Sequence, residues 1–152
     1  MSALDSPSTT DVIDRPFAGR LPPAPITAAS LAYGASGIDQ VRRLVEEAAT
    51  AAGLTSGRRD DLVVAVSEIA SNSVRHGGGS GVLRIWSDER ALVCQVEDAG
   101  YIRDPLAGRV RPAPTAEGGR GLWLANHLCD LVEIRSSERG TVVRMRMELP
   151  GR

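Results

Sequence analysis

Two stretches in the first half of the chain place apolar residues at the three- and four-residue spacing of an amphipathic helix. The first covers residues 38–52, and Gly53 follows it as an expected C-cap. The second starts at Asp60 or Asp61 and stops at Gly77, where three consecutive glycines can take the left-handed conformations that end helices. The pattern therefore predicts two long helices, each with one buried face.

Later stretches alternate apolar and polar residues or form short apolar runs, which indicates strands. A first hairpin is expected from residues 81–87 and 91–98, which flank the tight turn "DER". A second is expected from residues 131–137 and 141–149, which flank "ERG". In the last of these strands Arg144 alternates with apolar residues, so it is expected to face water.

The order of these elements predicts the fold class. A short edge strand (29–36) and two helices precede the first hairpin, and a helix within residues 118–130 precedes the second. This order predicts an α+β fold, a two-layer sandwich whose mixed, mostly antiparallel sheet is covered on one face by helices. We expect residues 31–152 to form the domain and the proline-rich residues 1–30 to form a flexible tail. Residues 99–117 form a long loop, and such loops are usually functional.

Composition narrows the function classes. The formal net charge is -1 and all 18 basic residues are arginine, so a direct nucleic-acid or anionic-membrane partner is not expected. The absence of lysine excludes a Walker-type phosphate loop and Schiff-base chemistry. No apolar run reaches the length of a membrane span, and the N-terminus lacks the pattern of a signal peptide. Cys94 and Cys129 lie in apolar segments without metal-ligand spacing, which indicates reduced core cysteines of a cytoplasmic protein.

Glu68, Asn72 and His76 stand four residues apart, so they share one stripe of the second predicted helix. Such a stripe can simply be a solvated helix face. It can also form one wall of a site, because a carboxylate can act as a base and an asparagine oxygen can bind Mg²⁺. Asparagine is a poor helix former and has no capping role at this position, which favours the site.

Two glycine-containing motifs add further candidates. Asp98 ends an apolar strand and Gly100 follows it. This is either a common Asp-x-Gly turn or a carboxylate that accepts a hydrogen bond from an exocyclic amine such as that of adenine. The sequence "GGRG" at residues 118–121 opens the third helix, and it is either a hinge or a phosphate cradle at a helix N-terminus. Neither motif alone decides between its two interpretations.

The order of the three motifs resembles the Bergerat ATP-binding fold of the histidine kinase-like (GHKL) ATPases. "AVSEIASNSVRHG" at residues 65–77 resembles the E-A-x-x-N-A-x-x-H-G box of the small anti-sigma factor serine kinases within that superfamily. "GGRGLWLANHLCDLVEI" at residues 118–134 resembles their second glycine box and the elements that follow it. The resemblance covers residues 36–149 and extends to the actinobacterial versions.

The resemblance implies a role for each matching residue. Glu68 would be the general base, and Arg42 on the first helix would reach the γ-phosphate, with Arg43 as the alternative. Asn72 would bind Mg²⁺, and Asp98 would hold the adenine amine. The residues implied to bind the nucleotide are Asn72, His76, Asp98, Gly100, Gly118, Gly119, Arg120, Gly121, Leu122 and Thr141.

The resemblance also implies a function: a cytoplasmic ATP-binding anti-sigma regulatory factor with serine/threonine protein kinase activity. It would phosphorylate an anti-sigma antagonist protein of the STAS type, and its other partners would be a sigma factor and a second copy in a homodimer. ATP and Mg²⁺ would be its cofactors.

One departure from the family pattern keeps an alternative open. Members of the family usually have the sequence D-x-G-x-G-F before the ATP lid, the loop that covers the nucleotide, and the lid is expected here at residues 101–117. This chain has Ile102 in place of the second glycine of that motif. That glycine gives the backbone freedom where the lid begins. The alternative is a Bergerat-fold ATP-binding module that acts by protein–protein binding without phosphotransfer.

Overall fold

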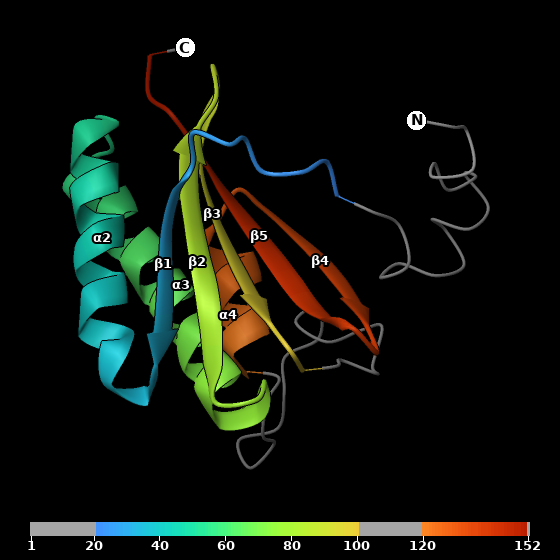
Figure 1. Ribbon diagram of the computed structural model, residues 1–152. Coiled ribbons are helices and arrows are strands. Elements are labelled where there is room, and N and C mark those ends of the chain that lie inside the picture. The colour runs from blue at the N-terminus through green and yellow to red at the C-terminus, as the bar shows by residue number, and fades with distance from the viewer. Residues whose placement is uncertain (1–20, 101–119, 152) are drawn as a thin grey trace, which may run out of the picture.

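A five-stranded sheet with helices against one of its faces forms the body of the chain (Figure 1). The computed structural model describes residues 21–100 and 120–151. The strands are β1 (Ala29–Gly34), β2 (Ser80–Ser87), β3 (Ala91–Asp98), β4 (Leu131–Ser137) and β5 (Gly140–Glu148). The helices are α2 (Ile38–Ala51), α3 (Ser56–His76) and α4 (Arg120–Leu128), with a short 3-10 turn, Ala35–Gly37, before α2.

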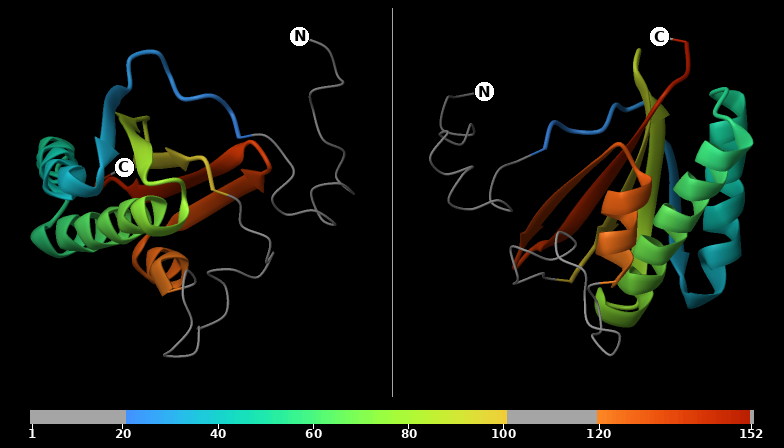
Figure 2. Two further views of the ribbon diagram at one scale, coloured as in Figure 1. Left: turned by 60° about the horizontal axis from the view of Figure 1, so that its bottom comes forward. Right: turned by 180° about the vertical axis from the view of Figure 1, so that it is seen from behind.

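The strands lie in the order β1-β2-β3-β5-β4, and each neighbouring pair is antiparallel. The three helices cover the same face, with α2 and α3 side by side and α4 next to α3 (Figure 2). The predicted two-layer α+β sandwich is confirmed. The sequence predicted a mixed, mostly antiparallel sheet. In the described residues the sheet is antiparallel throughout, because β3 and β5 join the two hairpins in antiparallel register.

The long helix α3 begins one turn earlier than the sequence predicted. Thr55 is its N-cap, and the Thr55 side chain accepts a hydrogen bond from the backbone N–H of Arg58 at 3.3 Å. This cap starts the helix at Ser56 rather than at Asp60. The helix ends at His76, as expected from the glycines that follow.

Aliphatic side chains from both layers fill the space between the helices and the sheet. Fully buried members include Val41, Val45, Leu62, Val66, Leu83, Val96, Met145 and Met147. Cys94 and Cys129 lie in the same core as free thiols, as expected. Burial raises the pKa of both thiols, that of Cys129 to about 12, so neither is a thiolate at neutral pH. Among the described helices, none is long and apolar enough to cross a membrane.

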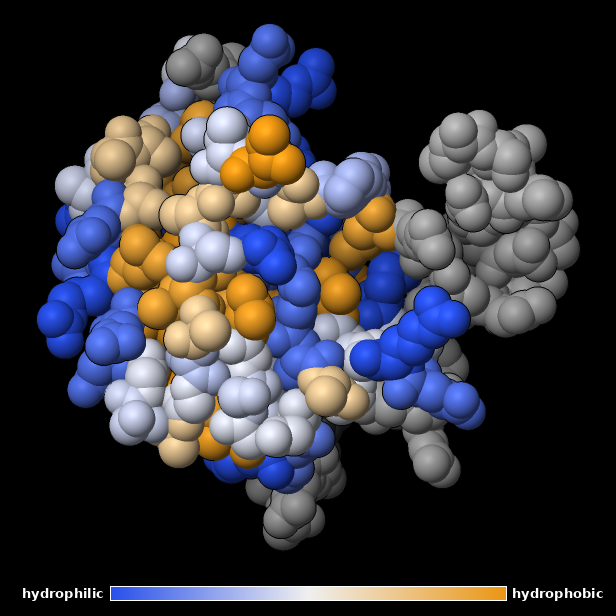
Figure 3. Space-filling model, viewed as in Figure 1, coloured by the Kyte–Doolittle hydropathy of each residue, from blue (hydrophilic) through white to orange (hydrophobic). Residues whose placement is uncertain are grey.

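The face of the sheet without helices is less exposed to water than the sequence predicted. Figure 3, seen from this side, shows apolar and charged side chains intermixed. Arg144 is only 6% exposed. Its Nε donates to Gln95 Oε1 at 2.8 Å, its Nη2 donates to Pro22 O at 2.5 Å, and its guanidinium lies 5.0 Å from the ring centroid of Trp86. The expectation that Arg144 faces water was wrong because residues 21–24 lie over this face.

Two predictions fall mainly outside the described residues. Residues 1–20 of the predicted tail are not described, whereas the end of its range, from Ala29, belongs to β1. The predicted lid, residues 101–117, lies outside the described residues entirely. Both therefore stay predictions.

Truncation of Arg144 tests how strongly the sheet depends on its covered face. Arg144→Ala removes two hydrogen bonds and leaves Gln95 and a backbone carbonyl without their donor. We expect the free energy of unfolding to fall by about 2 kcal/mol. Arg146→Ala is the matched control on the same strand: it removes an ion pair with Asp88 near the surface, so the loss should stay below about 1 kcal/mol. Urea denaturation of both variants measures the difference, and equal losses would contradict the covering role of residues 21–24.

Candidate functional site

Polar and glycine residues from separate stretches of sequence meet at one end of the molecule. The C-terminal half of α3, the end of β3, the start of α4 and the start of β5 all lie at this end (Figure 1). The β3–β5 register places Asp98 opposite Thr141. The backbone N–H of Ala99 donates to Gly77 O at 3.2 Å, which ties the end of β3 to the end of α3.

Two donors hold the carboxylate of Asp98. The backbone N–H of Gly100 donates to Oδ1 at 2.7 Å, and the Ser73 hydroxyl donates to Oδ2 at 2.8 Å. Gly77 stands against the same group, since a Cβ at Gly77 would lie 2.5 Å from Oδ2. The missing side chain of Gly77 therefore lets the carboxylate sit against the end of α3.

The start of β5 forms the other side of this cluster. The Thr141 hydroxyl donates to Gly100 O at 2.8 Å and lies 2.6 Å from the hydroxyl oxygen of Ser136. Gly140 has a φ of 140°, a conformation that favours glycine, and a Cβ there would collide with the backbone oxygen of Asp98. These contacts fix the backbone on both sides of the Asp98 carboxylate.

A second polar cluster lies where α3 passes the start of α4. Asn72 Oδ1 accepts a hydrogen bond from Arg75 Nη2 at 3.0 Å. A Cβ at Gly121 would collide with Asn72 Nδ2 and would lie 3.4 Å from the backbone oxygen of Glu68. The missing side chain of Gly121 therefore leaves room for the Asn72 amide at the N-terminus of α4, and a larger residue there would displace that amide.

The stripe of Glu68, Asn72 and His76 lies on α3, but its members differ in exposure. Glu68 and Asn72 are half-buried, whereas His76 is exposed. Arg42 lies on the neighbouring helix α2, where its side chain is 52% exposed and pairs with Asp39 at 3.3 Å. The structure thus places the stripe beside α4 and leaves Arg42 on the surface of α2.

The remaining candidate residues belong to the segment around the start of α4. Leu122 is 4% exposed and packs into the core, so only its backbone can reach a ligand. Gly118 and Gly119 lie outside the described residues, as do Ile102 and the side chain of Arg120. The described geometry therefore covers the surroundings of Asp98 and the α3 wall.

Sequence reasoning missed two buried polar residues near Asp98. Ser73 is fully buried on α3, and its hydroxyl donates to the carboxylate. Tyr33 on β1 is 5% exposed, and burial raises the pKa of its hydroxyl. A serine at a buried helical position was an available indication, because a buried hydroxyl needs a partner. Tyr33 offered none, since tyrosine is common in strands.

The two clusters suit different parts of one ligand. A carboxylate framed by glycines can accept a hydrogen bond from an exocyclic amine while a flat ring lies against the glycine backbone. An asparagine oxygen is a suitable ligand for Mg²⁺, which usually keeps one or two protein ligands and takes the others from phosphate and water. Asn72 Oδ1 would then exchange its contact with Arg75 for the ion.

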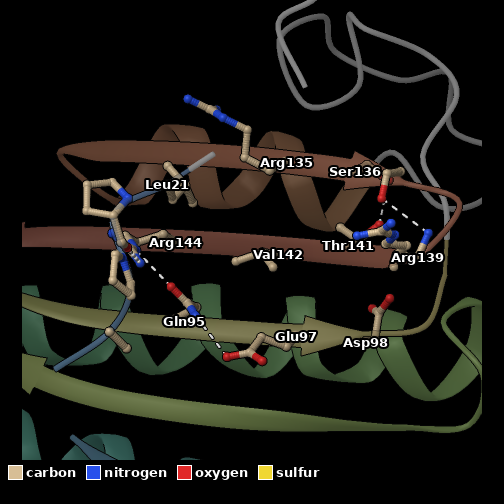
Figure 4. A pocket seen from close by; sticks show the side chains of 15 residues that line it. Leu21, Gln95, Glu97, Asp98, Arg135, Ser136, Arg139, Thr141, Val142 and Arg144 are labelled. Atoms are coloured by element: carbon tan, nitrogen blue, oxygen red, sulfur yellow. Dashed lines mark hydrogen bonds between the residues drawn. The ribbon is translucent and has the colours of Figure 1, made fainter. Parts of the chain in front are cut away.

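A cavity of about 500 Å³ lies on the opposite, open face of the sheet (Figure 4). Residues 21–24 form one wall, and Gln95, Glu97 and Arg144 are among the residues that line it. At one end the cavity reaches Asp98. At that end Ser136, Gly140 and Thr141 also line it, so the cavity is separate from the cluster between α3 and α4 but shares one side with the cluster around the carboxylate.

Comparisons with known proteins bear on this geometry. No curated protein matches the chain. The RsbU and RsbW domains of Rv1364c from Mycobacterium tuberculosis superpose with a TM-score of 0.57 at 20% identity, covering 84% of this chain and 33% of that one. The Acinetobacter baumannii histidine kinase AdeS gives a TM-score of 0.53 at 9% identity, covering 83% and 70%. The catalytic domain of the histidine kinase ThkA gives 0.51 at 14% identity, covering 80% and 96%.

At these identities the solved structures show the likeness of fold alone, and the chain spans only 33% of the first of them. The comparison with protein families shows the family of the chain as well as its fold. Residues 35–147 match the histidine kinase-like ATPase domain family, and this range contains the α3 stripe, the Asp98 cluster and the start of α4. The chain therefore belongs to the histidine kinase-like ATPase domain family, as an ATP-binding module of the GHKL type.

Proposed function

We propose that this chain is an anti-sigma regulatory factor that uses ATP to phosphorylate a serine or threonine of an anti-sigma antagonist protein. The observation that carries the proposal is the Asp98 carboxylate, held by two donors and framed by glycines at the end of the fold where α3 meets α4. The resemblance of residues 65–77 to the anti-sigma kinase box supports the narrower assignment. One of the similar structures contains a domain named RsbW, which agrees with it.

Adenine recognition is assigned to Asp98. Oδ1 and Oδ2 each accept one hydrogen bond within the protein, and each keeps a lone pair for the 6-amino group of the base. The missing side chains of Gly77 and Gly100 let the end of α3, the carboxylate and Gly100 pack in direct contact, and the adenine ring is assigned to the half-buried backbone of Gly100. Thr141 donates to Gly100 O and so holds the backbone beneath the ring.

Phosphate binding is assigned to the start of α4. The first N–H groups of a helix lack partners within it and lie at the positive end of its dipole, which favours phosphate. The residues given this role are Gly118, Gly119, Arg120, Gly121 and Leu122, with His76 at the end of α3. Asn72 would hold Mg²⁺ through Oδ1, and the ion would neutralise charge that develops on the phosphates.

Phosphoryl transfer requires two side chains from this protein, a general base and a positively charged group that contacts the γ-phosphate. Glu68 lies one turn before Asn72 on the same face of α3, so its carboxylate can take the proton from the acceptor hydroxyl as that oxygen attacks the γ-phosphorus. The bond from the γ-phosphorus to the bridging oxygen breaks in the same step, and ADP leaves with that oxygen. Arg42 would contact the γ-phosphate after it leaves Asp39. Breaking such an exposed pair costs less than about 1 kcal/mol.

A second function is favoured by two observations. Ile102 replaces the glycine expected where the lid begins, and the Arg42 guanidinium pairs with Asp39 on the surface of α2. In this alternative the chain binds ATP and acts by protein–protein contact, without phosphotransfer. In both cases we propose a sigma factor and a STAS-type antagonist as partners, a homodimeric assembly and a cytoplasmic location, all on the basis of the family resemblance.

Asp98→Asn tests the assignment of the base site. The variant presents an amide group to the adenine amine and weakens the acceptor, so we expect the affinity for Mg-ATP to fall at least about tenfold. Isothermal titration calorimetry measures the loss. Glu97→Gln is the control, because Glu97 lies on the other face of β3 and pairs with Arg84 at 2.6 Å. Equal ATP affinity of wild type and Asp98→Asn would overturn the base site.

Asn72→Ala tests the magnesium ligand. We expect the wild type to bind ATP more tightly when Mg²⁺ is present, and the variant to lose most of that gain, because its side chain offers no oxygen. Titrations with and without Mg²⁺ measure the difference. Asn126→Ala makes the same chemical change on α4, where Asn126 donates to Leu122 O at 3.2 Å, and should keep the gain. An unchanged Mg²⁺ dependence in Asn72→Ala would remove Asn72 as a ligand.

Glu68→Gln separates binding from phosphotransfer. We expect it to bind Mg-ATP within about threefold of wild type and to lower the rate of ADP formation about 10²- to 10⁴-fold, the usual contribution of a general base. Glu47→Gln, at an exposed position on α2, is the control and should change neither quantity. A binding defect as large as the rate defect would contradict the base assignment. A wild type that binds ATP without turnover would favour the second function.

A further inference from the structure

One buried hydroxyl near Asp98 has no part in the chemistry described above. Tyr33 is 5% exposed, and its Oη has no hydrogen-bond partner among the described residues. An unpaired hydroxyl in the interior is unfavourable, and phenylalanine would fill the same space without it. A tyrosine at this position therefore calls for an explanation in function or in binding.

Two glycines create the space for this phenol. Tyr33 on β1 pairs with Gly81 on β2, and a Cβ at Gly81 would lie 2.5 Å from Tyr33 Oη. A Cβ at Gly37 would lie 2.9 Å from Tyr33 Cβ. Neither glycine has a positive φ. The room that the tyrosine needs, rather than an unusual backbone conformation, therefore explains both glycines.

Ser73 connects Tyr33 to Asp98. Ser73 Oγ has one hydrogen and two neighbouring acceptors, Asp98 Oδ2 at 2.8 Å and Ile69 O at 3.3 Å. Burial raises the pKa of Tyr33, the Ser73 hydroxyl acts in the opposite direction, and the charge of Asp98 raises it further. The phenol is thus protonated at neutral pH. Its hydroxyl lies over Gly81, and the register of β2 and β3, with Val82 opposite Glu97, places Gly81 beside Asp98. A rotation of the phenol toward Ser73 would let Ser73 Oγ accept its hydrogen.

We propose that Tyr33 is a positioning residue that makes the site selective for a purine with a 6-amino group. This rests on the proposed function of Asp98. The Tyr33 hydroxyl, unpaired within the described part of the chain, donates to Ser73 Oγ when the nucleotide binds. The Ser73 hydrogen then points to the nearer acceptor, Asp98 Oδ2, and the carboxylate is fixed with a lone pair directed to the amine. Without the phenol hydroxyl, Ser73 can turn its hydrogen to Ile69 O, and Asp98 loses that restraint.

Tyr33→Phe separates this role from packing because it removes only the hydroxyl. We expect the Tm to stay the same or to rise, and the ATP affinity to fall about three- to tenfold, the range of one hydrogen bond. Purine riboside triphosphate, which lacks the 6-amino group, is the second probe. Its affinity is expected to stay unchanged, so the preference for ATP over this analogue falls by the same factor.

Ser73→Ala, alone and combined with Tyr33→Phe, tests the path between the phenol and the carboxylate. We expect the double variant to bind ATP as Ser73→Ala alone does, because Tyr33 acts through that hydroxyl. Ser67→Ala is the matched control: Ser67 is also buried on α3, but it donates to Val64 O at 3.1 Å. It should leave the preference for ATP intact.

The outcomes distinguish this inference from the proposed function. A lower Tm, failure of Tyr33→Phe to fold, or equal losses for both nucleotides would overturn the inference, since each would show that the hydroxyl serves the structure alone. If Asp98→Asn loses the preference for ATP while Tyr33→Phe keeps it, the proposed function stands and the role of Tyr33 is refuted. Absence of ATP binding by the wild type would overturn both.

Discussion

Asp98 can occupy its position only because glycines stand where side chains would collide with it. Gly77 lets the carboxylate lie against the end of α3, and Gly140 lets the β5 backbone pass close to the oxygen of Asp98. A side chain at Gly77 would displace the Asp98 carboxylate itself, and one at Gly140 would displace β5, which contributes aliphatic side chains to a close-packed core. The surroundings of the carboxylate are therefore set by the packing of the two layers, and the hydrogen bonds from Ser73 and Gly100 orient it within that frame.

The parts of the structure that depend on local pattern were predictable from the sequence. Apolar spacing predicted α2 and α3, and alternation predicted both hairpins, because each pattern requires only that one face of an element be buried. Glu68, Asn72 and Asp98 were identified as candidates because the order of their motifs along the chain resembles that of the GHKL ATPases, whereas each motif alone also fits an ordinary helix face or turn. The structure places the first two beside α4 and the third against α3.

The contacts between distant segments were not predictable in the same way. Alternation assigned Arg144 to a wet face, because it cannot reveal that a segment 122 residues earlier lies across the sheet. Ser73 and Tyr33 look like ordinary members of a helix face and a strand. Their relation to Asp98 depends on how α3 and β1 pack at the end of β3, which no single stretch of sequence encodes. The start of α3 was missed for a smaller reason, a threonine cap one turn before the apolar pattern begins.

At Gly121 the backbone of α4 rests directly on the amide of Asn72, because no Cβ separates them. A shift of the helix toward α3 would have to displace the Asn72 amide, and Leu122 in the core opposes a shift away from it. The first turn of α4 and the Asn72 amide are therefore in direct contact. The position of the asparagine is thus coupled to that of the helix N-terminus, because a shift of either one changes the contact between them.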